Sequence, residues 1–183
     1  MISGPASNLT EAGPVDPAAA RVGTDPAIVG EARVLEFHRY WLARRGERRF
    51  PARADIEPTD IPHLLVGIML LDVHYEPLDF EYRLIGDDIA RRMGSLKGKR
   101  VRAAALRNPA STAYDNYCRM IASGVPQFLK GSGIAAYRPG RQVTVSRVHC
   151  PLSTDGTVID KIISYVAFHE SRGTARGAAP ARS

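Results

Sequence analysis

Three consecutive strand-like segments in the last third of the sequence constrain the fold more than any other feature. They cover residues 127–137, 142–152 and 157–168, and two tight-turn signals, Pro139-Gly140 and Asp155-Gly156, separate them. The surrounding sequence lacks the alternating strand and helix pattern that would demand a parallel sheet. We therefore predict an antiparallel meander.

A hairpin is predicted upstream of the meander. Residues 66–74 form an apolar run with few polar breaks, as expected for a strand that is buried on both faces. After a turn at Glu76-Pro77, Phe80, Tyr82 and Leu84 alternate with charged residues, which is typical of a strand with one buried face. These two runs should pair with each other.

The remaining patterns predict helices. A long helix is expected over residues 26–45, with Asp25 as its cap and Gly46 as its stop. Shorter patterns predict a helix from Asp87 to Gly94, a basic connector up to Arg107, and a helix over residues 109–123. The order predicts an α+β domain, with a five-stranded antiparallel sheet and an N-terminal flanking helix.

The length of 183 residues suits one domain with tails. Residues 1–24 and 171–183 are rich in Ala, Gly, Pro, Ser and Thr, and the second stretch is also basic. Because neither stretch can bury enough apolar surface, we expect a flexible tail over 1–24, a domain over 25–170, and a flexible basic tail over 171–183. A chain trimmed to residues 24–170 is then expected to fold as well as the whole.

The sequence favours a cytoplasmic location. It contains only two cysteines, Cys118 and Cys150, so a disulfide framework is excluded and a reducing compartment fits. The longest apolar run, Leu64 to Leu71, is far shorter than the roughly 20 residues that span a bilayer, so no membrane insertion is expected. The first residues also lack the basic start and apolar core of a secretion signal.

Several local motifs follow one another between residues 28 and 168. They are Tyr40-Trp41; Pro51, Arg53, Asp55 and Pro58; Gly67 to Val73; Phe80-Glu81-Tyr82-Arg83-Leu84-Ile85-Gly86; and Pro151-Leu152-Ser153 through Asp155-Gly156 to Val158-Ile159-Asp160. In this order they resemble the bacterial family of small stand-alone PAS-domain proteins. The resemblance implies a five-stranded antiparallel sheet with helices over one face. It also implies a role in sensing a small molecule, redox state or light, or in dimerisation. Many PAS segments have Thr or Asn after the glycine, whereas Asp87-Asp88 follow here, so only a cap and turn role is transferred to Gly86.

Two sets of residues are candidate sites. Strand parity and helical spacing, together with the resemblance, predict a small and mainly apolar ligand cavity between sheet and helices. Its candidate walls are Tyr82, Ile89, Met93, Tyr117, Ile121 and Val145. They carry no intrinsic charge, so a ligand should be neutral or weakly polar; the alternative is that the same residues make an ordinary filled core.

The long N-terminal helix is the candidate dimer interface. Its apolar positions form two ridges, which is more apolar surface than one core contact requires. We therefore expect a homodimer that uses Leu35, Phe37, Trp41 and Leu42, with Trp41 as the anchor.

Cofactor and catalytic signals are weak. His149 and Cys150 are adjacent, so on a strand they would point to opposite faces, and no metal site is expected. Haem-binding PAS proteins generally place a histidine on a helix over the sheet, and the helix over 109–123 contains none, so haem is disfavoured. A covalent flavin is disfavoured because Tyr117 interrupts the asparagine, cysteine, arginine order of flavin photosensors. The cofactor is therefore unknown. No Gly-x-Ser-x-Gly elbow is present, and no catalytic residue is nominated.

Charge is unevenly distributed along the chain. Residues 55–88 contain nine acids and one base, a net charge of −8, and residues 91–107 contain seven bases and no acid, a net charge of +7. If the two segments lie on different faces, the molecule could associate head to tail or offer its basic loop to an acidic partner. The basic segment contains no aromatic residue for stacking, so nucleic acid is not the expected partner.

The leading hypothesis is a non-catalytic PAS-type sensory or regulatory module in bacterial signalling. It would bind a small molecule, mediate protein–protein interaction, or both, and pass its signal to an unidentified signalling protein. One alternative is a small cavity-type α+β enzyme in which His149 or Tyr117 acts on a substrate. Another is a nucleic-acid binder that uses residues 91–107.

Overall fold

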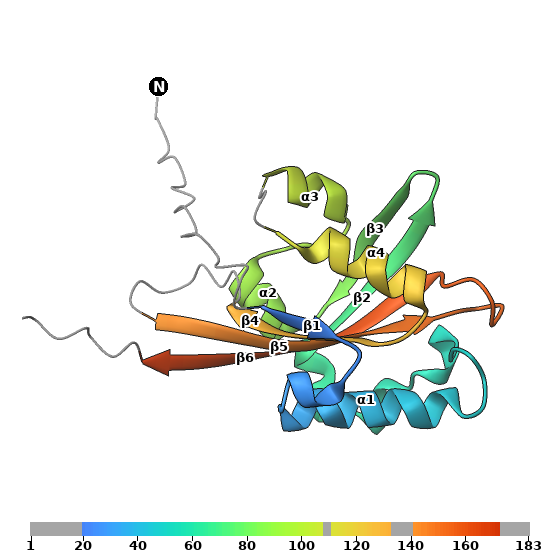
Figure 1. Cartoon of the computed structure of the whole chain (residues 1–183), viewed down its shortest axis with the longest axis horizontal. Helices are drawn as coiled ribbons and strands as arrows, with labels where there is room; N and C mark the ends of the chain where they lie inside the picture. Colours follow the sequence, from blue (N-terminus) through green and yellow to red (C-terminus); the bar gives the residue numbers. More distant parts are fainter. Residues whose placement is uncertain (1–19, 108–110, 133–140, 173–183) are drawn as a thin grey trace, which may run out of the picture.

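A six-stranded antiparallel sheet organises the chain. The computed structural model describes residues 20–107, 111–132 and 141–172. The strands lie in the order β1-β4-β5-β6-β2-β3 (Figure 1). Their bounds are β1 Arg21–Gly23, β2 Ile68–Tyr75, β3 Leu78–Ile85, β4 Gln127–Ser132, β5 Arg141–Leu152 and β6 Lys161–Arg172.

Both predicted strand groups are confirmed. β4, β5 and β6 pair in sequence order, with Phe128 opposite Val148 and Val148 opposite Tyr165. β2 and β3 form the hairpin, and β2 joins the meander through its pairing with β6. The Pro139-Gly140 turn lies outside the described residues. The α+β PAS-like fold is thus the one expected, with a sixth strand.

The sixth strand, β1, corrects the expected tail boundary. Residues 21–23 pair with β4, with Arg21 opposite Lys130 and Gly23 opposite Phe128. The folded part therefore begins before residue 24, and β6 carries it to Arg172, past the expected end at residue 170. Backbone pairing needs no apolar side chain, so composition alone could not detect this short edge strand. The rest of both expected tails lies outside the described residues.

The first helix is shorter than predicted. A turn of 3₁₀ helix, η2 (Pro26–Ile28), is capped by Asp25, whose carboxylate accepts a hydrogen bond from the Ala27 N–H at 2.8 Å. The chain then turns through Gly30, whose φ of 58° favours glycine, and α1 runs from Ala32 to Arg45. The predicted single helix over 26–45 is therefore divided at this glycine, and Gly46 ends it as expected.

The downstream helices agree with the sequence in part. α2 (Asp87–Met93) follows Gly86 as predicted. The supposed connector contains a further helix, α3 (Val101–Arg107), because its three consecutive alanines are strong helix formers. α4 covers Ala113–Ser123 and ends at Gly124, while the Asn108-Pro109 start lies outside the described residues.

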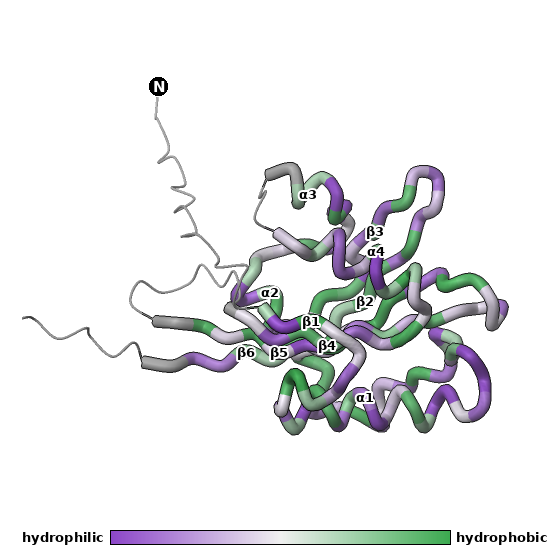
Figure 2. The backbone as a smooth tube through the Cα atoms, viewed as in Figure 1, coloured by the Kyte–Doolittle hydropathy of each residue, from purple (hydrophilic) through white to green (hydrophobic). Residues whose placement is uncertain are grey.

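Helices and turns cover both faces of the sheet. α1 packs on one face together with the turns η3 (Arg53–Asp55), η4 (Pro58–Asp60) and η5 (Pro62–Gly67), and we call this the α1 face. α3 and α4 lie on the other side, over β3 and β5, and we call it the α4 face (Figure 1). Figure 2 shows hydrophobic stretches in the strands between these helices. The sheet therefore separates two hydrophobic clusters.

Candidate functional site

A group of buried polar side chains lies on the α4 face of the sheet. Strand alternation brings His149 of β5 and Ser164 of β6 to this face, directly opposite each other in the antiparallel register. Tyr117 of α4 packs against His149, and Tyr82 of β3 adjoins Tyr117. We call Tyr82, Tyr117, His149 and Ser164 the polar cluster.

His149 is the most unusual member of the polar cluster. It is fully buried, its Nδ1 lies 2.7 Å from Ser164 Oγ, and its Nε2 has no hydrogen-bond partner among the described residues. Burial lowers the pKa of His149 well below its ordinary value, and the nearby Arg147 charge lowers it further. The ring is therefore neutral at physiological pH, with unused hydrogen-bonding capacity at Nε2.

The two tyrosines form the helix side of the polar cluster. The Tyr117 ring packs edge-on against the His149 ring, with 4.8 Å between ring centres, and lies 5.2 Å from the Phe80 ring. The Tyr82 and Tyr117 side chains lie in the same cluster and interact with each other. Burial raises the pKa of Tyr117 well above its ordinary value, and the adjacent Tyr82 raises it further, so both phenols are neutral hydrogen-bonding groups.

The chemistry available to the polar cluster includes recognition by hydrogen bonding. The Ser164 and His149 pair has the spacing of a nucleophile and its base, but both residues are fully buried and no described acid orients the ring through Nε2. The described residues contain no group of three His, Cys, Asp or Glu side chains that could hold a metal ion. Four neutral groups in an apolar surrounding can instead select a small molecule by hydrogen bonding.

Most of the predicted cavity residues are brought together on the α4 face. Tyr82, Ile89, Tyr117 and Val145 are buried in its cluster, and Ile121 packs against it. Met93 is 43% exposed and stands outside, because it falls at the end of α2 next to Gly94. The five inner residues are packed on one another, and an apolar cavity of about 330 Å³ lies on the α1 face instead.

Sequence reasoning named His149 only for the alternative enzyme, left it out of the candidate cavity wall, and missed Ser164 altogether. The signal was present, because His149 shares its strand face with Val145, four residues earlier, and Val145 was placed in the cavity wall. Ser164 had no such signal, since its role depends on the register between β5 and β6.

The structure also corrects the expected dimer anchor. Phe37 and Trp41 are buried against the sheet within this chain, and the Trp41 Nε1–H donates a hydrogen bond to the Pro151 carbonyl at 3.0 Å. Leu35 and Leu42 are half-buried at the edge of the same cluster. Of the four candidate residues, therefore, only these two leucines retain exposed surface for a partner.

Comparison with known proteins agrees with the fold. A family model described as a PAS domain matches residues 30–163 of the chain, which covers α1 and most of the sheet. The chain belongs to the PAS-domain family. The matched region contains every member of the polar cluster except Ser164, the residue that follows it. No curated protein and no solved structure gives a significant match to the chain.

Membership of the PAS family indicates the general role of the chain. PAS domains are sensory and regulatory modules that commonly mediate protein interactions and dimerise, so this chain is a module of that kind. Within the described part of the chain, no helix combines the length and the apolar character required to span a membrane.

Proposed function

We propose that this PAS domain is a non-catalytic sensory module of bacterial signalling that binds a small neutral or weakly polar molecule at the polar cluster. The main support for this proposal is the Nε2 atom of buried His149, which has no hydrogen-bond partner among the described residues. A buried polar group without a partner costs about 1–3 kcal/mol, and a ligand that supplies the missing hydrogen bond recovers part of this cost. The neutral state of His149 and both tyrosines favours an uncharged ligand.

Binding would be transmitted through α4. Tyr117 lies against the His149 and Phe80 rings, so a molecule bound at Nε2 would press on the Tyr117 ring. Tyr117 belongs to α4, and pressure on its ring would therefore change how this helix packs on the sheet. A shift of this kind in a packed element is a signal that a partner protein can recognise.

Thermal denaturation in the presence of a panel of neutral metabolites tests the proposal. We expect at least one compound to raise the melting temperature of the wild type, because a ligand that binds only the folded state stabilises it. Tyr117→Phe should reduce this gain by removing the hydroxyl while keeping the ring.

Tyr114→Phe is the matched control. The Tyr114 hydroxyl is on the same helix but donates to the Leu78 carbonyl, away from His149. This variant should keep the gain in melting temperature. Equal loss of the gain in both variants would contradict the proposed site.

We further propose a homodimer as the signalling form. α1 lies on the outside of the α1 face, and Leu35 and Leu42 are apolar and partly exposed there. These residues are seven positions apart and so lie on one side of the helix. The unidentified signalling partner would then meet a dimer rather than a single chain.

A small enzyme is the second candidate, supported by the 2.7 Å contact between His149 Nδ1 and Ser164 Oγ. An enzyme requires substrate access to Ser164, which is fully buried. Turnover of ester or amide substrates that is lost in Ser164→Ala would favour this function over sensing.

A further inference from the structure

The α1 face contains a cavity that is separate from the polar cluster. Its volume is about 330 Å³, within the size range of small-molecule sites, and it lies between turns η3 to η5 and strands β2, β3 and β6. Most of its lining is aliphatic, including Ile56, Ile61, Ile68, Leu70, Leu84 and Ile163. The sheet separates it from Tyr117 and His149 on the α4 face.

Backbone contacts fix the shape of this cavity. The Gly86 N–H donates to the Ile68 carbonyl at 2.8 Å, and a Cβ at Gly86 would lie 2.4 Å from the Val66 carbonyl oxygen. Gly86 thereby holds the end of β3 against η5. Arg53 of the Pro51-x-Arg53 motif lines the same cavity from η3, so this motif and the end of the Phe80-to-Gly86 motif meet here.

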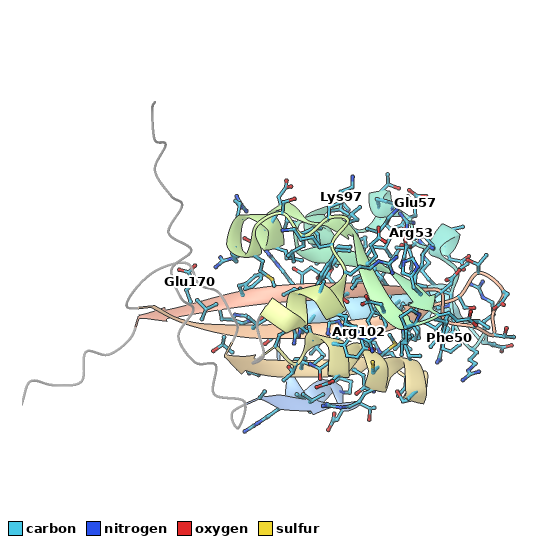
Figure 3. All side chains as sticks on the ribbon, turned by 90° about the horizontal axis from the view of Figure 1, so that it is seen from above. Phe50, Arg53, Glu57, Lys97, Arg102 and Glu170 are labelled. Carbon is cyan, nitrogen blue, oxygen red and sulfur yellow. The ribbon has the colours of Figure 1, made fainter. Side chains whose placement is uncertain are left out.

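Arg53 gives the cavity a positive charge at its wall. Its guanidinium is held in place by a hydrogen bond from Nη1 to the Ile56 carbonyl at 2.9 Å. Among the described residues no acid forms an ion pair with Arg53, and its neighbour Asp55 is paired with Arg48 at 2.8 Å. Figure 3 shows Arg53 at the opposite end of the molecule from Glu170, which pairs with Arg92. Arg53 therefore retains donors for an anion.

The mouth of the cavity is apolar and open to water. Leu65, Val66 and Leu84 line it and are 38%, 42% and 44% exposed. Covering such side chains is favourable because apolar surface leaves water. The lining thus combines an aliphatic interior with one fixed cation, Arg53, and one acid, Asp87.

We propose that this cavity binds an aliphatic carboxylate, with the alkyl chain among the isoleucines and leucines and the carboxylate on Arg53. Asp87 also lines the cavity and is exposed. Its negative charge opposes a second anionic group on the ligand, so monocarboxylates are selected over dicarboxylates. The site lies beyond the proposed sensing site, and either can exist without the other.

Titration calorimetry of the full chain with octanoate, 1-octanol and octanedioate tests the proposal. Octanoate should bind at least about tenfold more tightly than 1-octanol, since only octanoate carries a carboxylate that can form charged hydrogen bonds with Arg53. Arg53→Gln should remove that difference while leaving 1-octanol binding unchanged, and Arg53→Lys should restore part of it. Asp87→Asn should narrow the preference for octanoate over octanedioate.

Leu84→Trp provides a second test, because a larger ring at this exposed position obstructs the mouth without entering the core. It should abolish octanoate binding, and Val158→Trp, at a residue 49% exposed and outside the cavity lining, should leave it intact. Tyr117→Phe should also leave it intact, which separates this site from the polar cluster.

The proposal would be overturned by the absence of octanoate binding at millimolar concentration, by binding that survives Leu84→Trp, or by equal affinity for octanoate and 1-octanol. A change of oligomeric state in Leu84→Trp without octanoate binding to the wild type would also overturn it, and would assign the cavity to a second copy of the chain.

Discussion

At the scale of single residues, His149 makes stability depend on pH. Its pKa is lowered by burial in the folded chain, whereas in the unfolded chain it returns to about 6.5. Below that pH the unfolded chain binds a proton that the folded chain does not, so this contribution to stability is present above about pH 6.5 and is lost as the pH falls. We expect the free energy of unfolding to decrease between pH 7 and about pH 5.

His149→Gln should flatten this pH dependence, and urea unfolding followed by the fluorescence of Trp41, the only tryptophan, measures it. Ser164→Ala is the control, because it removes the partner of His149 and leaves the titrating ring buried. An unchanged pH slope in His149→Gln would contradict the buried neutral histidine.

Gly86 is the second residue with a strong prediction. Its φ of −67° is allowed for any residue, so the cost of Gly86→Ala comes from contact alone. The added Cβ would lie within 2.4 to 2.5 Å of the Val66 and Leu65 carbonyl oxygens, and we expect a loss of about 1–3 kcal/mol in unfolding free energy. Ser95→Ala, at an exposed position, should change stability by less than about 0.5 kcal/mol. Equal stability of the two variants would show that this close approach does not exist.

The face on which a residue lies was predicted well from the sequence where a single strand or helix determines it. Tyr82, Tyr117 and Val145 fall on the α4 face as parity requires. Trp41 shows the limit of such reasoning, because its position on an apolar ridge does not say whether the ridge meets the sheet or a second chain. Only the packed structure reveals its hydrogen bond to Pro151.

At the scale of elements, the pairing of β1 predicts that a chain trimmed to begin at residue 24 is less stable than a chain that includes β1. A chain that begins at residue 24 loses the pairing of residues 21–23 with β4. We expect its unfolding free energy to fall by about 1 kcal/mol and its melting temperature by a few degrees, relative to a chain that begins at residue 20. Both chains should end at residue 172, which keeps β6 complete. Identical melting curves would mean that β1 contributes no stability.

α1 is the helix through which we expect the chain to self-associate. Leu35→Glu combined with Leu42→Glu should shift a dimer to a monomer, because two charges would be placed in an apolar contact. Sedimentation velocity over a range of concentrations measures this shift, and Arg39→Glu, at an exposed position of the same helix, is the control for a charge change. A wild type that remains monomeric at high concentration would contradict the proposed dimer.

Elements were predictable in type more than in extent. Alternation and apolar runs identified β2 to β6, since each strand has a buried face. The break at Gly30 was missed because the sequence does not show that its φ is positive, and helix α3 was missed because its charged residues were given more weight than its three alanines.

At the scale of the whole molecule, the acidic and basic segments are in contact and form ion pairs with each other. Arg100 lies 3.3 Å from Glu81, and residues 81 and 100 also form a β-bridge. Arg92 similarly pairs with Asp88 at 3.4 Å and Arg102 hydrogen-bonds to Tyr114. The basic segment therefore adjoins the acidic one, and several of its charges are already engaged. This arrangement depends on tertiary contacts that charge counting along the sequence does not reveal.

Native mass spectrometry of the protein isolated from the cells that produce it tests the central claim most directly. We predict one small neutral molecule of constant mass per chain in the wild type, and its loss in Ile121→Trp, where a larger ring fills space beside Tyr117 on the α4 face. Tyr114→Phe should retain the molecule. A wild type without any bound mass, whose melting temperature also fails to respond to neutral metabolites, would contradict sensing at the polar cluster.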